Sequence, residues 1–334
     1  MKLLCISCLL TLGIFFMNGC VPPAPSAADS AQRSGTTAMH KLQHGGLTRT
    51  FALYLPVRYN PSVSHPLVIA LHGGGGDAKK WPTYTNNGFE RLADRDQFLL
   101  IYPEGIEGQW NDKRGVKDFA AQRDNVDDVG FIGVLIDYLV SNYPVDRDRI
   151  YVAGASNGGM MANYVGAQFS DKVAAIATVI ASIPDNLLPL MHPKQPLSVL
   201  MINGSEDPLV RWKGGVVKFG KKETGSVIPV EKTLQFWVNH NKLNSQPKVI
   251  DLPDKNPEDG TRITRSVYQG GGASAEVVLY TVKGGGHTWP AFEDKRGPLM
   301  KLMVDKLVGK KSRNLDACQT IWEFFKSHPK IRTQ

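Results

Sequence analysis

The stretch Arg149–Val165 reads RIYVAGASNGGMMANYV, and it decides the fold. Its first residues are β-branched and aromatic and predict a strand, whereas Met160–Val165 contains no breaker and predicts a helix. Between them Gly154 and Gly158 flank Ser156 in the pattern Gly-x-Ser-x-Gly, which is typical of a sharp turn that exposes a serine hydroxyl. A side chain at either glycine would collide with the neighbouring backbone. The stretch therefore predicts a strand, a tight turn and a helix, with Ser156 as a nucleophile.

A serine hydroxyl is a good nucleophile only when a histidine takes its proton and an acid orients that histidine. In a strand–turn–helix architecture of this kind the acid and the histidine follow later strands, in the order serine, acid, histidine. Buried apolar runs at 197–202 and 277–282 end in loops that hold Asp207 and His287. We therefore expect Asp207 to orient His287, and His287 to act as general base and then as general acid.

Alternatives remain open for both residues. Asp207 precedes a proline and is also suited to a structural turn, which leaves Asp185 and Glu206 as competing acids. His287 is also suited to packing on Trp289 as an ordinary loop histidine. His72 follows a buried run but precedes the serine, so it suits the oxyanion loop better than the role of base.

An acyl intermediate needs two hydrogen-bond donors for its oxyanion. The backbone N–H of Asn157 is one candidate, and that of Gly74, or less favourably Gly75, is the other. The glycines at 73–76 also resemble a dinucleotide-binding fingerprint, but Trp81-Pro82 soon interrupts the helix that such a site needs. No motif for a metal or a cofactor is present, so neither is expected.

Apolar runs and helical patterns alternate along the rest of the chain. The run at 50–55, ended by Pro56, predicts an antiparallel strand, and continuous apolar runs predict buried parallel strands. The buried runs lie at 67–71, 98–102, 173–180, 197–202 and 277–282, and the helical patterns at 129–143, 230–239 and 315–325. Asp127 or Asp128 is available to cap the first of these helices. The alternation predicts an α/β fold with a mostly parallel sheet and helices on both faces, without internal repeats.

The amino terminus has the pattern of an export signal. Lys2 precedes an apolar run that is too short to span a membrane, and residues 17–20 end in a cysteine as bacterial lipoprotein signals do. We expect residues 1–20 to be a signal peptide, with lipid attached to Cys20 or, alternatively, cleavage further along the chain. Residues 21–41 are rich in Pro, Ala, Ser and Thr and suit a disordered tether. The catalytic domain is then expected at 42–330, in an exported protein attached to a bacterial membrane or secreted.

Composition limits the classes of partner. The chain has 334 residues, 42% hydrophobic and 21% charged, which is typical of a globular protein. Its net charge of +8 is dispersed without an arginine-rich helix, so no nucleic-acid partner is expected. The basic surface is either simply solvated or attracted to acidic polysaccharide or lipid head groups. Cys5 and Cys8 would leave with the signal and Cys20 would be lipidated, so Cys318 alone remains and no intrachain disulfide is expected.

Several ordered motifs resemble the polyhydroxybutyrate depolymerase-like and feruloyl esterase family of α/β-hydrolases. These motifs are Leu71–Gly75, Trp110–Asp112, Val126–Phe131, Gly154–Met161, Asn203–Pro208 and Gly285–Pro290. The resemblance implies an α/β-hydrolase fold without a large separate lid domain, and it assigns the triad to Ser156, Asp207 and His287. It implies an exported serine carboxylesterase that hydrolyses feruloyl, acetyl or hydroxyacyl esters in polysaccharide-linked or polyester substrates. The alternative is a non-catalytic envelope lipoprotein that binds polysaccharide through the same cleft; a peptidase is supported least.

The chain also departs from that family. Many relatives carry a cysteine pair near the positions held here by Leu243 and Gly270–Gly272, and we expect no polymer-binding module after the domain. Trp110, Trp212 and Trp289 lie in loops that should border Ser156. They are either a platform for an aromatic acyl group or a sugar ring, or ordinary loop packing.

Overall fold

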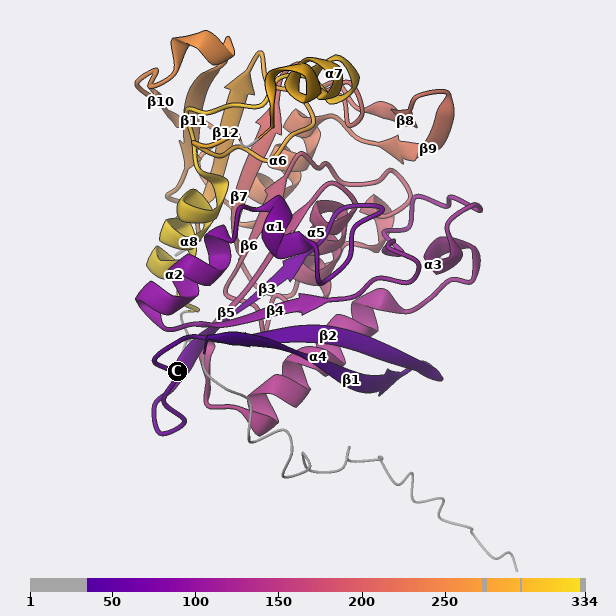
Figure 1. Ribbon diagram of the computed structural model, residues 1–334, viewed down its shortest axis with the longest axis vertical. Coiled ribbons are helices and arrows are strands. Elements are labelled where there is room, and N and C mark those ends of the chain that lie inside the picture. The colour runs from indigo at the N-terminus through magenta and orange to yellow at the C-terminus, as the bar shows by residue number, and fades with distance from the viewer. Residues whose placement is uncertain (1–34, 272–274, 295, 331–334) are drawn as a thin grey trace, which may run out of the picture. The chain divides into compact units, whose positions relative to one another are not determined.

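A ten-stranded sheet organises the chain (Figure 1). The computed structural model describes residues 35–271, 275–294 and 296–330. The strand order is β1-β2-β4-β3-β5-β6-β7-β12-β11-β10. Neighbours from β4 to β12 pair in parallel, whereas β1 and β2 at one edge and β11 and β10 at the other join antiparallel. The predicted α/β class with a mostly parallel sheet is confirmed.

The elements of the sheet and its helices have the following bounds. The strands are β1 (Thr36–His44), β2 (Leu47–Leu55), β3 (His65–Leu71), β4 (Leu99–Pro103), β5 (Val145–Ala155), β6 (Ala175–Val179), β7 (Ser198–Gly204), β10 (Lys248–Asp251), β11 (Arg262–Tyr268) and β12 (Val277–Lys283). A separate hairpin is formed by β8 (Gly215–Phe219) and β9 (Lys222–Val227). The helices are α1 (Trp81–Tyr84), α2 (Gly88–Asp96), α3 (Ala120–Arg123), α4 (Asp128–Asn142), α5 (Asn157–Gln168), α6 (Val230–His240), α7 (Pro298–Val308) and α8 (Ala317–Ser327), and short 3₁₀ turns lie at Leu188–Leu190 and Pro257–Asp259.

Two apolar clusters, one on each face of the sheet, form the core. Along β3 the side chains alternate: Leu67 and Ile69 join the cluster that α4, α5 and α6 cover, whereas Val68 and Ala70 join the cluster that α2 and α8 cover. This alternation is the expected consequence of the two-residue period of a strand. Helices therefore cover both faces, as predicted, and the central strands are buried throughout.

The helix caps follow the sequence signals. Asp127 caps α4 by accepting a hydrogen bond from the N–H of Gly130, as one of the two predicted aspartates. Asp316 caps α8 in the same way, with its acceptor 2.9 Å from the N atom of Gln319. A side chain at the cap satisfies a backbone N–H that has no partner within the helix.

The amino-terminal boundary of the domain needs a correction. The tether was expected over residues 21–41, but β1 begins at Thr36 and pairs with β2 along its whole length. His40, assigned to the tether, is buried and stacks on Phe51 with ring centroids 5.2 Å apart. The expected signal, Cys20 and most of the expected tether lie outside the described residues.

Three further observations concern the dinucleotide-binding alternative, membrane-spanning helices and the cysteine. The loop after β3 leads to α1, which has only four residues and begins at Trp81, and this is not the helix of a dinucleotide site. Within residues 35–330, apart from the gaps given above, no helix has the length and apolar character to cross a bilayer. Cys318 is buried and not disulfide-bonded.

Candidate active site

Ser156 lies at the junction between β5 and α5 in a strained backbone conformation. Its φ is 51° and its ψ is −120°, a region that non-glycine residues rarely occupy. Its N–H donates to the C=O of Val179 at the end of β6, and its C=O accepts from the N–H of Met160 in α5. The strain is therefore held from both sides by the sheet and by the helix.

The two flanking glycines are required by close backbone contacts. A Cβ atom at Gly154 would lie 2.2 Å from the carbonyl oxygen of Gly158, and one at Gly158 would lie 2.3 Å from that of His72. Real Cβ atoms do not approach backbone atoms so closely, so any larger residue would push the turn apart. The steric collision that was predicted as the reason for the two glycines is thus present in the structure.

Ser156, His287 and Asp207 form a continuous hydrogen-bonded chain. His287 Nε2 lies 2.9 Å from Ser156 Oγ, and His287 Nδ1 lies 2.7 Å from Asp207 Oδ2. A carboxylate can only accept, so Nδ1 carries the proton and Nε2 is free to accept the hydroxyl proton of Ser156. The hydrogen bond from His287 goes to Asp207 and not to the competing acids of the sequence analysis.

Neighbouring parallel strands bring the acid and the histidine together. Asp207 follows β7 and His287 follows β12, and these two strands pair directly. The loops touch closely, since a Cβ atom at Gly204 would lie 2.4 Å from the carbonyl oxygen of Gly285. Asp207 is buried, and its Oδ1 accepts from the N–H groups of Leu209 and Val210. The other carboxylate oxygen is therefore left to orient the imidazole.

The glycine loop after β3 lies against Ser156. A Cβ atom at Gly73 would lie 3.7 Å from Cβ of Ser156. The N–H of Gly75 donates to the C=O of Gly108, at 2.8 Å, so it is engaged within the loop. This engagement favours Gly74 over Gly75 as the second oxyanion donor, beside Asn157 at the first position of α5.

The neutral imidazole of His72 holds this loop in place. Its Nδ1 lies 2.8 Å from the carbonyl oxygen of Gly73, and its Nε2 accepts from the N–H of Gly105 at 3.0 Å. Because one nitrogen donates and the other accepts, the ring is a neutral tautomer. Burial lowers the pKa of His72 below its ordinary value. His72 was expected in this loop, and its ring connects the loop by hydrogen bonds to the segment after β4.

A buried polar network supports Asn157, the residue after Ser156. The side chain of Asn157 accepts from the N–H of Trp110 and donates to its C=O, and its Nδ2 also lies 2.6 Å from Asp112. Asp112 in turn forms a buried ion pair with Arg114, at 2.8 Å, and accepts from Gln122. The conformation at the start of α5 is therefore fixed by a carboxylate that lies outside the triad.

Sequence reasoning missed Asp112 and Gln109 as site residues. Gln109 covers the glycine loop, since a Cβ atom at Gly74 would lie 3.0 Å from its Oε1. Among the described residues this buried Oε1 has no hydrogen-bond partner. Asp112 lay within a motif that the family resemblance singled out, so the signal was present although no role was assigned to it.

Two of the three tryptophans do not fit the expected platform. Trp110 is fully buried, and its Nε1 donates to the C=O of His72. Trp289 is also buried and packs edge-on against Trp81, with ring centroids 5.6 Å apart. Both are therefore loop packing, and the expectation of a platform was wrong for them because their rings are buried in the two apolar clusters of the core. Trp212 alone of the three is half-exposed.

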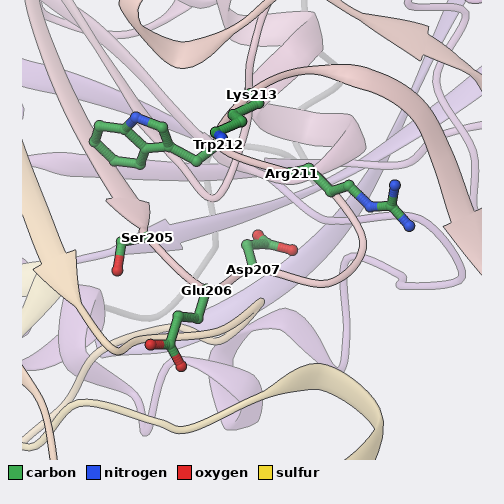
Figure 2. Close-up of a pocket in the computed structure, with 6 residues that line it drawn as sticks. All are labelled: Ser205, Glu206, Asp207, Arg211, Trp212 and Lys213. Atoms are coloured by element: carbon green, nitrogen blue, oxygen red, sulfur yellow. The ribbon is translucent and has the colours of Figure 1, made fainter.

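Trp212 lines an open pocket of about 370 Å³ that adjoins the acid side of the triad. Ser205, Glu206 and Asp207 lie on one side of this pocket, and the ring of Trp212 extends along another (Figure 2). The indole Nε1 of Trp212 donates to Glu231 at the start of α6, which fixes the ring.

No group of three His, Cys, Asp or Glu side chains in the described part of the chain is arranged to hold a metal ion.

Comparisons with known proteins identify relatives of this chain. Residues 49–183 match the family profile described as Esterase PHB depolymerase. NocK of Nocardia uniformis subsp. tsuyamanensis, which carries a provisional esterase name, is 28% identical over 296 residues, or 86% of this chain and 82% of that protein. Feruloyl esterase B of Piromyces equi is 26% identical over 72% of this chain, which spans only 42% of that protein.

A solved structure supports the fold. The acetyl xylan esterase from Aspergillus awamori superposes with a TM-score of 0.50 at 15% identity, covering 75% of this chain and 94% of that one. An identity this low is informative about the fold alone. Residues 49–183 thus resemble the Esterase PHB depolymerase family, and with the esterase relatives this shows that the chain is a carboxylic ester hydrolase with the α/β-hydrolase fold.

Proposed function

We propose that the chain is a serine esterase in which Ser156 attacks the ester carbonyl and forms an acyl-enzyme. His287 takes the hydroxyl proton through Nε2 and gives it to the leaving alcohol, and Asp207 keeps the imidazole in the required tautomer. The same histidine then takes a proton from water as the water attacks the acyl-serine, and it returns that proton to Ser156 Oγ as the acid is released. The N–H groups of Gly74 and Asn157 stabilise the oxyanion in both steps.

The observation that carries this proposal is the hydrogen-bonded chain from Ser156 Oγ through His287 to Asp207, with distances of 2.9 and 2.7 Å. A strained serine at a helix start supports it further, because the first N–H groups of α5 are not used within the helix. A polysaccharide-binding protein without catalysis would need neither the strain nor the oriented imidazole.

We propose esters of polysaccharides or of short oligomers as substrates, with feruloyl, acetyl or hydroxyacyl groups as the acyl part. Relatives named feruloyl esterase and acetylxylan esterase support this range. Trp212 is a half-exposed aromatic side chain at the pocket beside Asp207, so it is our candidate for contact with an aromatic acyl group or a sugar ring.

One experiment tests the proposal directly. The purified protein is treated with a fluorophosphonate probe and assayed on p-nitrophenyl and feruloyl esters, beside Ser156→Ala and a control variant, Ser205→Ala. Ser205 is a suitable control because it lies at the same pocket but contacts Gly284 and not the triad. We expect labelling and turnover in the wild type and the control only. Absence of both in the wild type would refute the enzyme assignment.

The identity of the acid is tested separately. Asp207→Asn should lower kcat by about four orders of magnitude because the imidazole adopts the wrong tautomer. Asp185→Asn should leave turnover unchanged. Loss of turnover in Asp185→Asn with normal turnover in Asp207→Asn would identify Asp185 as the acid that orients His287.

We further propose export through residues 1–20 and lipid attachment at Cys20. The apolar run, the preceding Lys2 and the cysteine at its end support this assignment. Metabolic labelling with a radioactive fatty acid should mark the wild type and not Cys20→Ser. A labelled Cys20→Ser variant would exclude this cysteine as the site.

A further inference from the structure

Helix α7 exposes the apolar side chains that a surface helix normally buries. None of its residues is buried. The half-buried positions are 301, 304, 305 and 308, so this spacing marks the face toward the protein. The outward side chains are Leu299, Met300, Leu302, Met303 and Leu307, which are 56–72% exposed. A contiguous apolar patch of this kind marks an interaction surface.

Specific contacts fix this orientation of α7. Asp305 faces the protein and pairs with Arg296 at 3.1 Å, and Arg296 also pairs with Asp294 at 2.6 Å. At the end of the helix the C=O of Val308 accepts from the N–H of His287. Turning the apolar face inward would turn Asp305 outward and break these contacts, which leaves Arg296 without one of its two carboxylate partners. The exposed face is thus built into the fold.

The net charge of the segment around this face is positive. From residue 293 to residue 313 the chain holds seven basic residues and three acidic residues, Glu293, Asp294 and Asp305. Lys306 and Lys310 are exposed, and neither has a carboxylate within ion-pairing distance among the described residues. Lys255 adds a further positive charge over the exposed ring of Phe292. Apolar side chains beside unpaired lysines are the pattern of a helix that lies in the plane of an anionic lipid interface.

We propose that α7 docks on the surface of an anionic phospholipid membrane. The leucine and methionine side chains enter the boundary between head groups and acyl chains, and Lys306 and Lys310 meet the lipid phosphates. α7 lies beyond the carboxyl ends of β7 and β12, the strands that lead to Asp207 and His287 (Figure 1). Docking therefore holds the triad close to the membrane. Docking through this surface does not depend on esterase activity.

Vesicle co-sedimentation tests the proposal. The full chain carrying Cys20→Ser, so that no lipid anchor contributes, is mixed with vesicles of phosphatidylcholine or of phosphatidylcholine with phosphatidylglycerol. We expect binding to the anionic vesicles that weakens with salt. Leu302→Gln with Leu307→Gln should lower the partition coefficient at least about tenfold. Lys306→Gln and Lys310→Gln should each lower it about fivefold.

Two exposed valines elsewhere provide the matched control, since Val57→Gln and Val249→Gln remove similarly exposed apolar groups. Neither valine variant should change vesicle binding. Every variant should hydrolyse a soluble p-nitrophenyl ester at the rate of the wild type. Far-UV circular dichroism confirms folding in any case. No binding to anionic vesicles, equal binding to both kinds of vesicle, or equal effects of the valine and leucine variants would overturn the proposal. A leucine-dependent dimer in light scattering without vesicle binding would also overturn it and assign the face to self-association.

Discussion

The buried ion pair between Asp112 and Arg114 offers the sharpest test of how the site is supported. The Asp112 carboxylate accepts from the side chains of Arg114, Gln122 and Asn157, at 2.8, 2.9 and 2.6 Å. Its side chain is 0% exposed and that of Arg114 is 5% exposed. In Asp112→Asn an amide NH₂ group faces one of these donors, and the Arg114 charge stays buried without a counter-charge.

The expected cost follows from this burial. Removing one partner of a buried ion pair destabilises a protein by about 3–5 kcal/mol. Because Asn157 loses a partner at the same time, the oxyanion donor at the start of α5 shifts, and we expect kcat to fall at least about tenfold with little change in KM. Urea unfolding measures the first effect, and initial rates on a p-nitrophenyl ester measure the second.

A surface ion pair provides the control for Asp112→Asn. Arg123 and Asp124 also pair closely, at 2.8 Å, but both side chains are more than half exposed. Asp124→Asn should therefore leave the urea midpoint and the rates unchanged. Equal midpoints for the two variants would refute the argument from burial. A destabilised Asp112→Asn with normal kcat would restrict Asp112 to a structural role.

The remaining predictions concern the loop, the turn and the pocket. The pKa of His72 is lowered from its ordinary 6.5, so the neutral form stabilises the fold above pH 6.5. The free energy of unfolding of the wild type relative to His72→Gln, from urea titrations, should then fall as the pH drops below 6.5; a constant difference from pH 8 to pH 5 would contradict this. Gly158→Ala should destabilise by at least about 1–3 kcal/mol in the same assay because its Cβ meets backbone at 2.3 Å, whereas Gly297→Ala should be neutral because nothing lies within 4 Å. Trp212→Ala should raise KM for feruloyl esters and destabilise less than Trp289→Ala, which should cost about 3–5 kcal/mol; an unchanged KM in the first variant would exclude Trp212 from the binding site.

The central strands could be predicted because their signal lies within each strand. The apolar runs at 67–71, 197–202 and 277–282 are continuous since both faces of those strands are buried. The order of these strands and the turn glycines was sufficient to predict that Ser156, Asp207 and His287 would meet. The structure brings the three together through neighbouring parallel strands.

The edge elements could not be predicted in the same way. β1 is composed of residues that suit a tether, and its strand character comes from pairing with β2. β10 and the β8–β9 hairpin are only partly buried and therefore lack a continuous apolar run. The burial of Trp110 and Trp289 depends on loops that are distant in sequence, so local composition could not distinguish a platform from packing. Asp112 gained its partners from α3 and α5 in the same manner.

The distribution of tryptophans makes the intrinsic fluorescence of this chain a selective optical probe. All six tryptophans lie in the described residues, and five are buried: Trp81, Trp110, Trp237, Trp289 and Trp322. Indole emission shifts to longer wavelength in contact with water, and collisional quenchers reach only accessible rings. Acrylamide quenching of the native protein should therefore act mainly on Trp212, at the pocket beside Asp207. Protection from the quencher by a bound feruloyl compound would report occupancy of that pocket without any chemical label.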